Sequence, residues 1–156
     1  PDAISSTIKL VIAGKPEVAE VPVLPNKDGI ITLLPHDAAL HGETIKSEQK
    51  GRAPANLGFW TNPNDTVTWD LQADRDGKFS LQVEAASEAA GSVIKITGIG
   101  DLAFPAPKTG DYAKYQTVKV GTVTLAKGAK LTLKLQPVAD GWHAVNIRKI
   151  ILSPEP

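Results

Sequence analysis

The segment Thr66-Val67-Thr68-Trp69-Asp70-Leu71 decides the fold class of this 156-residue chain. Polar and apolar side chains alternate along it, which is typical of an antiparallel strand with one face on a core and the other in water. The same alternation returns in Phe79–Ala85 and in Leu131–Gln136. Because Trp69 is in phase with the apolar positions of its segment, we expect its ring in the core.

Further strands are expected where β-branched residues cluster between turn residues. The pairs Asp76-Gly77 and Lys127-Gly128 have the composition of hairpin turns. Only Glu84–Ala90 looks helical, and Gly91 ends it. The pattern predicts an all-β chain folded as an antiparallel β-sandwich (jelly roll) of about 9–10 strands. The additional strand segments are Thr7–Ala13, Ile30–Leu34, Val93–Thr97, Tyr115–Val120, Thr122–Ala126 and Val145–Leu152.

Prolines at positions 16, 22 and 25 interrupt the segment Gly14–Gly29, so that neither a helix nor a central strand can continue through it. We expect residues 15–29 to be a Pro-rich linker, extended or lying along a sheet edge, and residues 30–156 to form the jelly-roll module. Residues 1–14 then hold a stray strand, which either joins the sandwich or, as we favour, ends an upstream domain. Since the chain begins with Pro1, we expect a processed product or a piece of a longer protein.

The composition excludes several classes of protein. The 17 basic and 17 acidic residues give a net charge of zero, which argues against a nucleic-acid partner. The absence of Cys rules out a thiol nucleophile, a Cys-based zinc site and an iron–sulfur cluster. The apolar stretches are far too short to cross a bilayer, so we expect no association with a membrane.

The histidines and acidic pairs form no recognisable catalytic or metal-binding motif. No HExxH or His-x-His spacing is present, and we interpret the histidines as exposed or hydrogen-bonded loop residues. A Ser–His–Asp triad stays open, because triads assemble in space, but no Gly-x-Ser-x-Gly turn marks a nucleophile. We interpret the acidic pairs as solvated groups rather than glycosidase acids. These residues are His36, His41 and His143, with the pairs Asp65/Asp70 and Asp74/Asp76.

Three aromatic residues, Trp60, Tyr112 and Trp142, fall in turn-like segments rather than at alternating core positions. Exposed rings beside Asn and Asp commonly hold sugars, because the ring stacks on the apolar C–H face of a pyranose while polar groups bind its hydroxyls. The alternative is that these rings close the ends of the sandwich. Spacing does not decide between the two.

Residues 56–69 read NLGFWTNPNDTVTW. This stretch resembles the N-(I/L)-G-(Y/F)-W-T-N-x-x-D-x-V-x-W pattern of the carbohydrate-binding-module-like domains at the C-terminus of bacterial α-L-fucosidases and some sulfatases. Ser6–Pro16 also looks like the closing strand of the β-domain in such fucosidases. The resemblance covers roughly residues 30–152 through further collinear stretches, namely Asp37–Gly42, Thr109–Val118, Gly121–Leu125 and Val145–Ile147.

In outline the domain is similar to the family 6 and family 35 carbohydrate-binding modules, which are β-jelly rolls that bind glycans through loops at one end. The resemblance implies that Phe59 or Trp60, together with Tyr112, sandwiches a sugar, and that Asn146 binds its hydroxyls. Trp142 is added from its position alone.

The same modules carry a structural calcium, held by glutamates in the first strand and an aspartate in the last. Here Leu34, His36 and Arg148 stand at those positions. An arginine cannot share such a site with a cation, so we expect the calcium site to be lost. We expect no metal and no other cofactor.

The resemblance therefore implies a non-catalytic accessory module of a bacterial glycoside hydrolase, α-L-fucosidase-like, that is secreted or periplasmic. Its expected partners are a weakly bound glycan and the parent catalytic domain. The first alternative is a structural or interaction β-sandwich that packs on its catalytic domain and binds no sugar. The second is a small hydrolase that uses Asp65 or Asp70 with a loop histidine.

Overall fold

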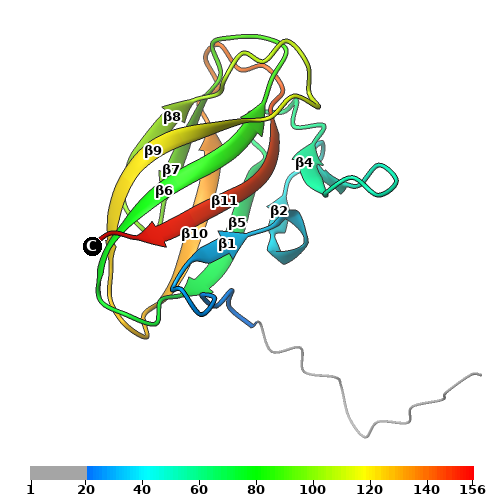
Figure 1. Ribbon diagram of the computed structural model, residues 1–156. Helices are drawn as coiled ribbons and strands as arrows, with labels where there is room; N and C mark the ends of the chain where they lie inside the picture. Colours follow the sequence, from blue (N-terminus) through cyan, green and yellow to red (C-terminus); the bar gives the residue numbers. More distant parts are fainter. Residues whose placement is uncertain (1–20) are drawn as a thin grey trace, which may run out of the picture.

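The structure is a computed structural model and describes residues 21–156 of the chain. These residues form two antiparallel sheets packed face to face (Figure 1), which confirms the predicted all-β sandwich. The elements are β1 (Ile31–Leu33), the short 3-10 helix η1 (Pro35–Asp37), β2 (Ala39–His41), β3 (Lys46–Glu48), β4 (Asn56–Gly58), β5 (Thr66–Gln72), β6 (Gly77–Ala86), β7 (Val93–Thr97), β8 (Leu102–Pro105), β9 (Gln116–Leu125), β10 (Lys130–Pro137) and β11 (Asn146–Pro154).

The six-stranded sheet runs in the order β3-β4-β11-β6-β9, and β1 pairs with β11 as well. The five-stranded sheet runs in the order β2-β5-β10-β7-β8. Alternate residues of β5, β6 and β10 point into the space between the sheets, as their sequence pattern predicts. Trp69 is buried there, as expected, together with Leu71, Phe79 and Leu133. This apolar layer supports the loops at both ends of the sandwich.

The predicted hairpin turns are wrong, because neither turn joins neighbouring strands of one sheet. Asp76-Gly77 links β5 to β6 and Lys127-Gly128 links β9 to β10, and in each case the two strands belong to different sheets. Both turns cross from one layer of the sandwich to the other. They also bond to one another, since the amide of Lys127 donates to the Asp76 carboxylate (2.8 Å).

Two other local predictions are corrected by pairing between strands. Glu84–Ala90 is not helical: β6 continues to Ala86 because its last residues pair with β9 and β11. The segments predicted as two strands around Gly121 form the single strand β9, and a register shift beside that glycine absorbs the irregularity. The short strands β2, β3, β4 and β8 were not predicted.

The predicted strand Thr7–Ala13 lies outside the described residues. The described part of the predicted linker follows the outer edge of β5. Val23 bridges to Leu71, with its amide donating to the Asp70 carbonyl (2.8 Å) and its carbonyl accepting from the Gln72 amide (3.1 Å). Among residues 21–156, no helix is long and apolar enough to cross a membrane.

Candidate functional site

Phe59, Tyr112 and Asn146 line one hollow at the end of the sandwich where the loops before β9 and β11 gather (Figure 1, top). Phe59 directly follows β4, Tyr112 lies in the loop between β8 and β9, and Asn146 is the first residue of β11. The hollow has a volume of about 260 Å³, and Glu48, Thr61 and Ala144 complete its wall. The structure thus brings together three of the five residues predicted to bind sugar.

Phe59 presents its ring to solvent in a strained backbone conformation. Its side chain is 60% exposed, and its φ of 55° is the only positive φ of a non-glycine residue among the described residues. A bulky residue in the left-handed region costs about 1–3 kcal/mol, and such strain concentrates at binding sites. The ammonium of Lys46 lies 5.7 Å from the ring centroid. An exposed ring held at an energetic cost favours a binding role.

The loop that carries Tyr112 is fixed by hydrogen bonds to the end of β6. The Thr109 amide donates to the Ser87 carbonyl (2.9 Å), and the Ser87 amide donates to Thr109 Oγ1 (3.1 Å). The Ala113 amide donates to the Asp111 carboxylate (2.8 Å). Burial raises the pKa of the Tyr112 hydroxyl, and the charge of Glu88 raises it further. The phenol is therefore protonated at neutral pH and able to donate a hydrogen bond.

Asn146 lies at the centre of a polar cluster that backs the hollow. Its side chain is 8% exposed, and its Nδ2 donates to the Tyr112 carbonyl (3.2 Å). Asn56 Nδ2 donates to Glu48 Oε1 (2.8 Å). These groups converge on Gly58, where a Cβ would lie 2.4 Å from Glu48 Oε1 and 3.1 Å from both Asn146 Oδ1 and Asn56 Nδ2. Only glycine leaves room for this arrangement.

A second hollow of about 290 Å³ continues from the first and shares Glu48, Tyr112 and Asn146 with it. We call the two together the loop groove. Its second part adds charged side chains, an amide and a further ring, namely Lys50, Asp111, Arg148, Asn56 and Tyr115. The two cations and two carboxylates of this part balance, so the lining offers hydrogen-bond donors and acceptors with no excess charge.

Sequence reasoning missed Glu48, Asn56 and Tyr115 as groove residues. Asn56 stands in the stretch that carries the resemblance, and that stretch was the available signal. Glu48 reaches the groove because β3 pairs with β4, opposite Asn56. A three-residue strand shows no alternation that would have revealed this pairing.

The two tryptophans of the prediction are not among the groove residues. Trp60 is completely buried, and its Nε1 donates to the Asp65 carbonyl (3.1 Å), so the prediction that it stacks on a sugar is wrong. Trp142 is half-buried, contacts the Trp60 ring edge-on at 5.5 Å, and donates from Nε1 to the Trp60 carbonyl (3.1 Å). Both rings close the end of the sandwich. Simple alternation from the buried Leu57 would turn Phe59 inward, and the left-handed backbone at Phe59 breaks that alternation, so that Phe59 is exposed and Trp60 buried.

Asp65 is a structural anchor rather than a catalytic acid. Its carboxylate is buried and accepts hydrogen bonds from the Glu43 amide (3.1 Å), the Thr44 amide and hydroxyl (2.8 and 2.6 Å) and the Ile45 amide (2.9 Å). Burial alone would raise its pKa, but these hydrogen bonds outweigh burial and lower it. Asp65 is thus ionised, and both of its carboxylate oxygens accept hydrogen bonds.

The other polar candidates are engaged separately. His41 Nε2 bonds to Thr68 Oγ1 (2.8 Å), Asp70 accepts from Thr132 Oγ1 (2.5 Å), and the Asp74 carboxylate pairs with the Arg75 guanidinium (3.0 Å). No pair of a carboxylate and a histidine forms at the loop groove among the residues described. These positions fit the structural interpretation better than hydrolysis.

The three positions that the resemblance assigns to calcium do lie together. Leu34, His36 and Arg148 line one hollow beside Glu84 and Lys149. Within residues 21–156, no group of three His, Cys, Asp or Glu side chains is arranged to hold a metal ion. Arginine and lysine supply the positive charge at this place.

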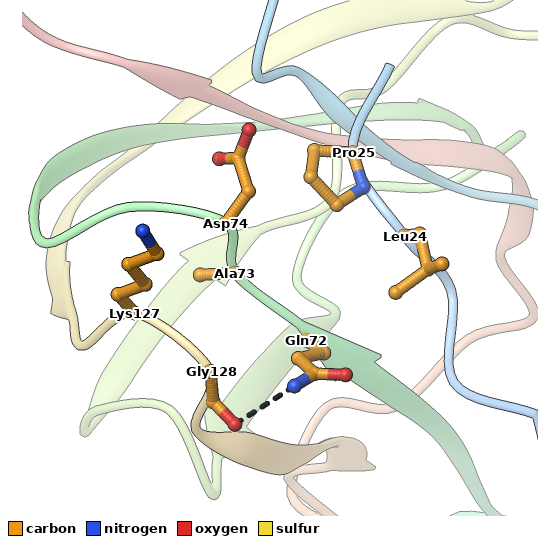
Figure 2. Close-up of a pocket in the computed structure, with 7 residues that line it drawn as sticks. All are labelled: Leu24, Pro25, Gln72, Ala73, Asp74, Lys127 and Gly128. Atoms are coloured by element: carbon orange, nitrogen blue, oxygen red, sulfur yellow. Dashed lines mark hydrogen bonds between the residues drawn. The ribbon is translucent and has the colours of Figure 1, made fainter. Parts of the chain in front are cut away.

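Another hollow, of about 400 Å³, lies at the opposite end of the sandwich (Figure 2). Leu24 and Pro25 form one side, Asp74 and Lys127 the other, and Gln72 Nε2 donates to the Gly128 carbonyl (2.9 Å) across it. Its lining contains no aromatic ring. The loop groove, with rings and amides, is chemically better suited to a polar ligand.

The family model described as "Domain of unknown function (DUF5077)" matches residues 44–156. The chain belongs to the DUF5077 family. Its sequence matches no curated protein. The matched residues include β4, the Tyr112 loop and β11, so the whole loop groove lies within the DUF5077 domain.

Solved structures with the same fold as this DUF5077 domain include carbohydrate-binding modules. The C-terminal family 6 module of LamC, a marine laminarinase from Zobellia galactanivorans, superposes with a TM-score of 0.66 at 15% identity, over 80% of this chain and 98% of that chain. The family 6 module of Cellvibrio mixtus lichenase 5A, in complex with cellotriose, gives a TM-score of 0.63 at 15% identity, over 80% and 97% of the two chains. A family 35 module from Clostridium thermocellum gives 0.64 at 13% identity, over 81% and 98%. At these identities the similarity shows a shared jelly-roll fold.

Proposed function

We propose that this domain is a non-catalytic carbohydrate-binding module that holds a neutral glycan in the loop groove. The observation that carries the proposal is the convergence of an exposed, strained Phe59, the Tyr112 ring and the Asn146 amide on one hollow. Aromatic faces suit the C–H face of a pyranose, and the amide and carboxylate beside them suit its hydroxyls. The shared fold with modules that include a cellotriose complex supports this function.

A neutral ligand follows from the charges of the groove. Lys50 and Arg148 are matched by Glu48 and Asp111, so an acidic sugar would gain no net attraction. Each hydroxyl of a neutral sugar both donates and accepts hydrogen bonds, and the mixed lining offers both kinds of partner. Stacking supplies about 1–3 kcal/mol per aromatic contact, which corresponds to weak, roughly millimolar to high-micromolar binding. Tethering to an enzyme would make such affinity useful.

We further propose a parent glycoside hydrolase of the α-L-fucosidase kind and an exported location. The sequence resemblance supports the parent, and detection of the full-length protein in secreted or periplasmic fractions would test the location. We propose no catalytic role for the domain itself, because the side chains of His41, Asp65 and Asp74 are engaged in separate structural bonds.

One observation favours the alternative of a structural domain that packs on its neighbour. Trp60 and Trp142 close the sandwich end instead of facing a ligand. In that case Phe59 would be covered by the neighbouring domain in the full-length protein, and no sugar would bind.

A screen against an array of neutral oligosaccharides, cellotriose and fucosylated glycans included, distinguishes the proposed glycan-binding module from the structural alternative. We expect binding that Tyr112→Ala and Phe59→Ala each weaken by about 1–3 kcal/mol. Leu24→Ala, at the opposite hollow, is the matched control and should bind as the wild type does. If Tyr112→Ala and Phe59→Ala bind as tightly as the wild type, the assignment of the groove is wrong.

A further inference from the structure

A β-bulge in β11 redirects Arg148 toward the loop groove. The register between β11 and β6 shifts between Ile147 and Lys149, so Arg148 is the extra residue without a partner in β6. Arg148 and Lys149 are consecutive and both half-buried, which breaks the alternation of the strand. Bulges of this kind commonly occur beside binding sites, where they change the direction of one side chain.

The two basic residues of the bulge make different contacts. The Lys149 ammonium approaches the Glu84 carboxylate at 3.3 Å. Arg148 lies 4.0 Å from the same carboxylate, and its guanidinium stacks on the Tyr115 ring at 3.7 Å from the centroid. A stacked guanidinium is a favourable cation–π contact that restrains both side chains. The main partner of Arg148 is therefore the ring and not the carboxylate.

Tyr115 and Asn146 both line the second part of the groove. Burial raises the pKa of the Tyr115 hydroxyl, and the nearby side chains of Asn146 and Arg148 offset this rise in part. Asn146 is held from its other side by the Tyr112 carbonyl. Arg148, Tyr115 and Asn146 thus form one part of the groove wall, which leads from the bulge to the amide.

We propose that Arg148 is a positioning residue of the glycan site. It fixes the ring of Tyr115, and Tyr115 together with the Tyr112 backbone holds the Asn146 amide in the orientation that binds sugar hydroxyls. This inference rests on the proposed glycan-binding function. It assigns to the bulge a role in ligand affinity that acts through Tyr115 and requires no contact between Arg148 and the sugar.

The test compares Arg148→Met with Lys149→Met. Each variant removes one positive charge from the same stretch of β11 beside Glu84, but only the first removes the stack on Tyr115. We expect Arg148→Met to raise the Kd for the strongest-bound neutral oligosaccharide of the array, cellotriose included, by about two- to five-fold. Lys149→Met should leave the Kd unchanged. All titrations are made well below the unfolding midpoint of each variant.

A double-mutant cycle with Tyr115→Leu identifies the route of the effect. We expect Tyr115→Leu alone to weaken binding, and the addition of Arg148→Met to that variant to weaken it no further. Additive losses would mean that Arg148 contacts the ligand itself, and equal losses in the Arg148 and Lys149 variants would mean a general charge effect. Either result overturns the positioning role. If the wild type binds no neutral oligosaccharide, the proposed function fails; if it binds and Arg148→Met binds equally, only the positioning role fails.

Discussion

Replacing Asp65 by Asn should make the domain much easier to unfold. The Asp65 carboxylate is 1% exposed and accepts four hydrogen bonds from residues 43–45, three of them from backbone amides. Asn keeps one acceptor oxygen and turns an NH₂ group toward amides that also donate. A hydrogen bond to a charged group contributes about 1.5–3 kcal/mol, and at least one such bond is lost while other donors are left unsatisfied. We expect a loss of about 3–4 kcal/mol in the free energy of unfolding.

The assay is urea unfolding followed by tryptophan fluorescence, which reports on this region because the Trp60 indole donates to the Asp65 carbonyl. Asp70→Asn is the matched control, because that carboxylate is half-buried and accepts one side-chain bond, from Thr132. It should cost less than about 1 kcal/mol. Comparable losses in the two variants would refute the view that Asp65 anchors the loop.

The pH dependence provides a second check on the same carboxylate. Folding lowers the pKa of Asp65, so its ionised form stabilises the fold at pH values above the unfolded pKa of about 3.9, and this contribution is lost as the pH falls through the lower, folded pKa. The difference in stability between wild type and Asp65→Asn should therefore be full at pH 7 and shrink below about pH 4. A difference that stays constant down to pH 2.5 would contradict the reasoning.

Phe59→Gly should weaken glycan binding at least about five-fold, which calorimetry measures. The free energy of unfolding, measured with urea, should change by less than about 1 kcal/mol, because relief of the left-handed strain offsets the lost ring contacts. Gly98→Ala should destabilise by about 2–4 kcal/mol, since its Cβ would lie 1.9 Å from the Thr132 carbonyl oxygen at a φ of 87°. Gly110→Ala should lower the free energy of unfolding by only about 1 kcal/mol, because its φ is 73° but no atom lies within 4 Å of the added Cβ. Equal shifts in the melting temperature of the Gly98 and Gly110 variants would contradict the steric argument. Calcium and a chelator should leave the unfolding midpoint unchanged, because Arg148 stands at the assigned calcium position; a rise in midpoint with calcium would show otherwise.

The alternating pattern was sufficient to predict β5, β10 and most of β6. Seven residues of β5 show the period of two plainly, because one face is buried and the other is not. The three residues of β3 or β4 cannot show it. The turn at Asp76-Gly77 was located from its composition. Its composition could not predict the sheet to which the turn leads, because a tight reversal needs the same residues whether the chain returns to its own sheet or crosses to the other sheet.

The candidate site was predictable in part for similar reasons. The resemblance pointed to the segment that holds Phe59 and Trp60 but left open which ring faces outward. The left-handed φ of Phe59 decides this, and no local propensity predicts such a conformation for phenylalanine. Glu48 and Tyr115 enter the groove through strand pairing and loop packing. Such contacts between distant parts of the chain leave no periodic signal in the sequence.

The strand β11 links the groove to the opposite end of the sandwich. It begins at Asn146, ends at Pro154, and pairs with β1, β4 and β6 along its length (Figure 1). If a ligand held in the groove and the polypeptide beyond Pro154 were pulled apart, the force would run along this strand. The hydrogen bonds of an antiparallel ladder lie perpendicular to the strands, so they would be loaded in shear and would share the force rather than open one after another. The domain is therefore built to resist mechanical tension applied between the loop groove and the C-terminal end of β11.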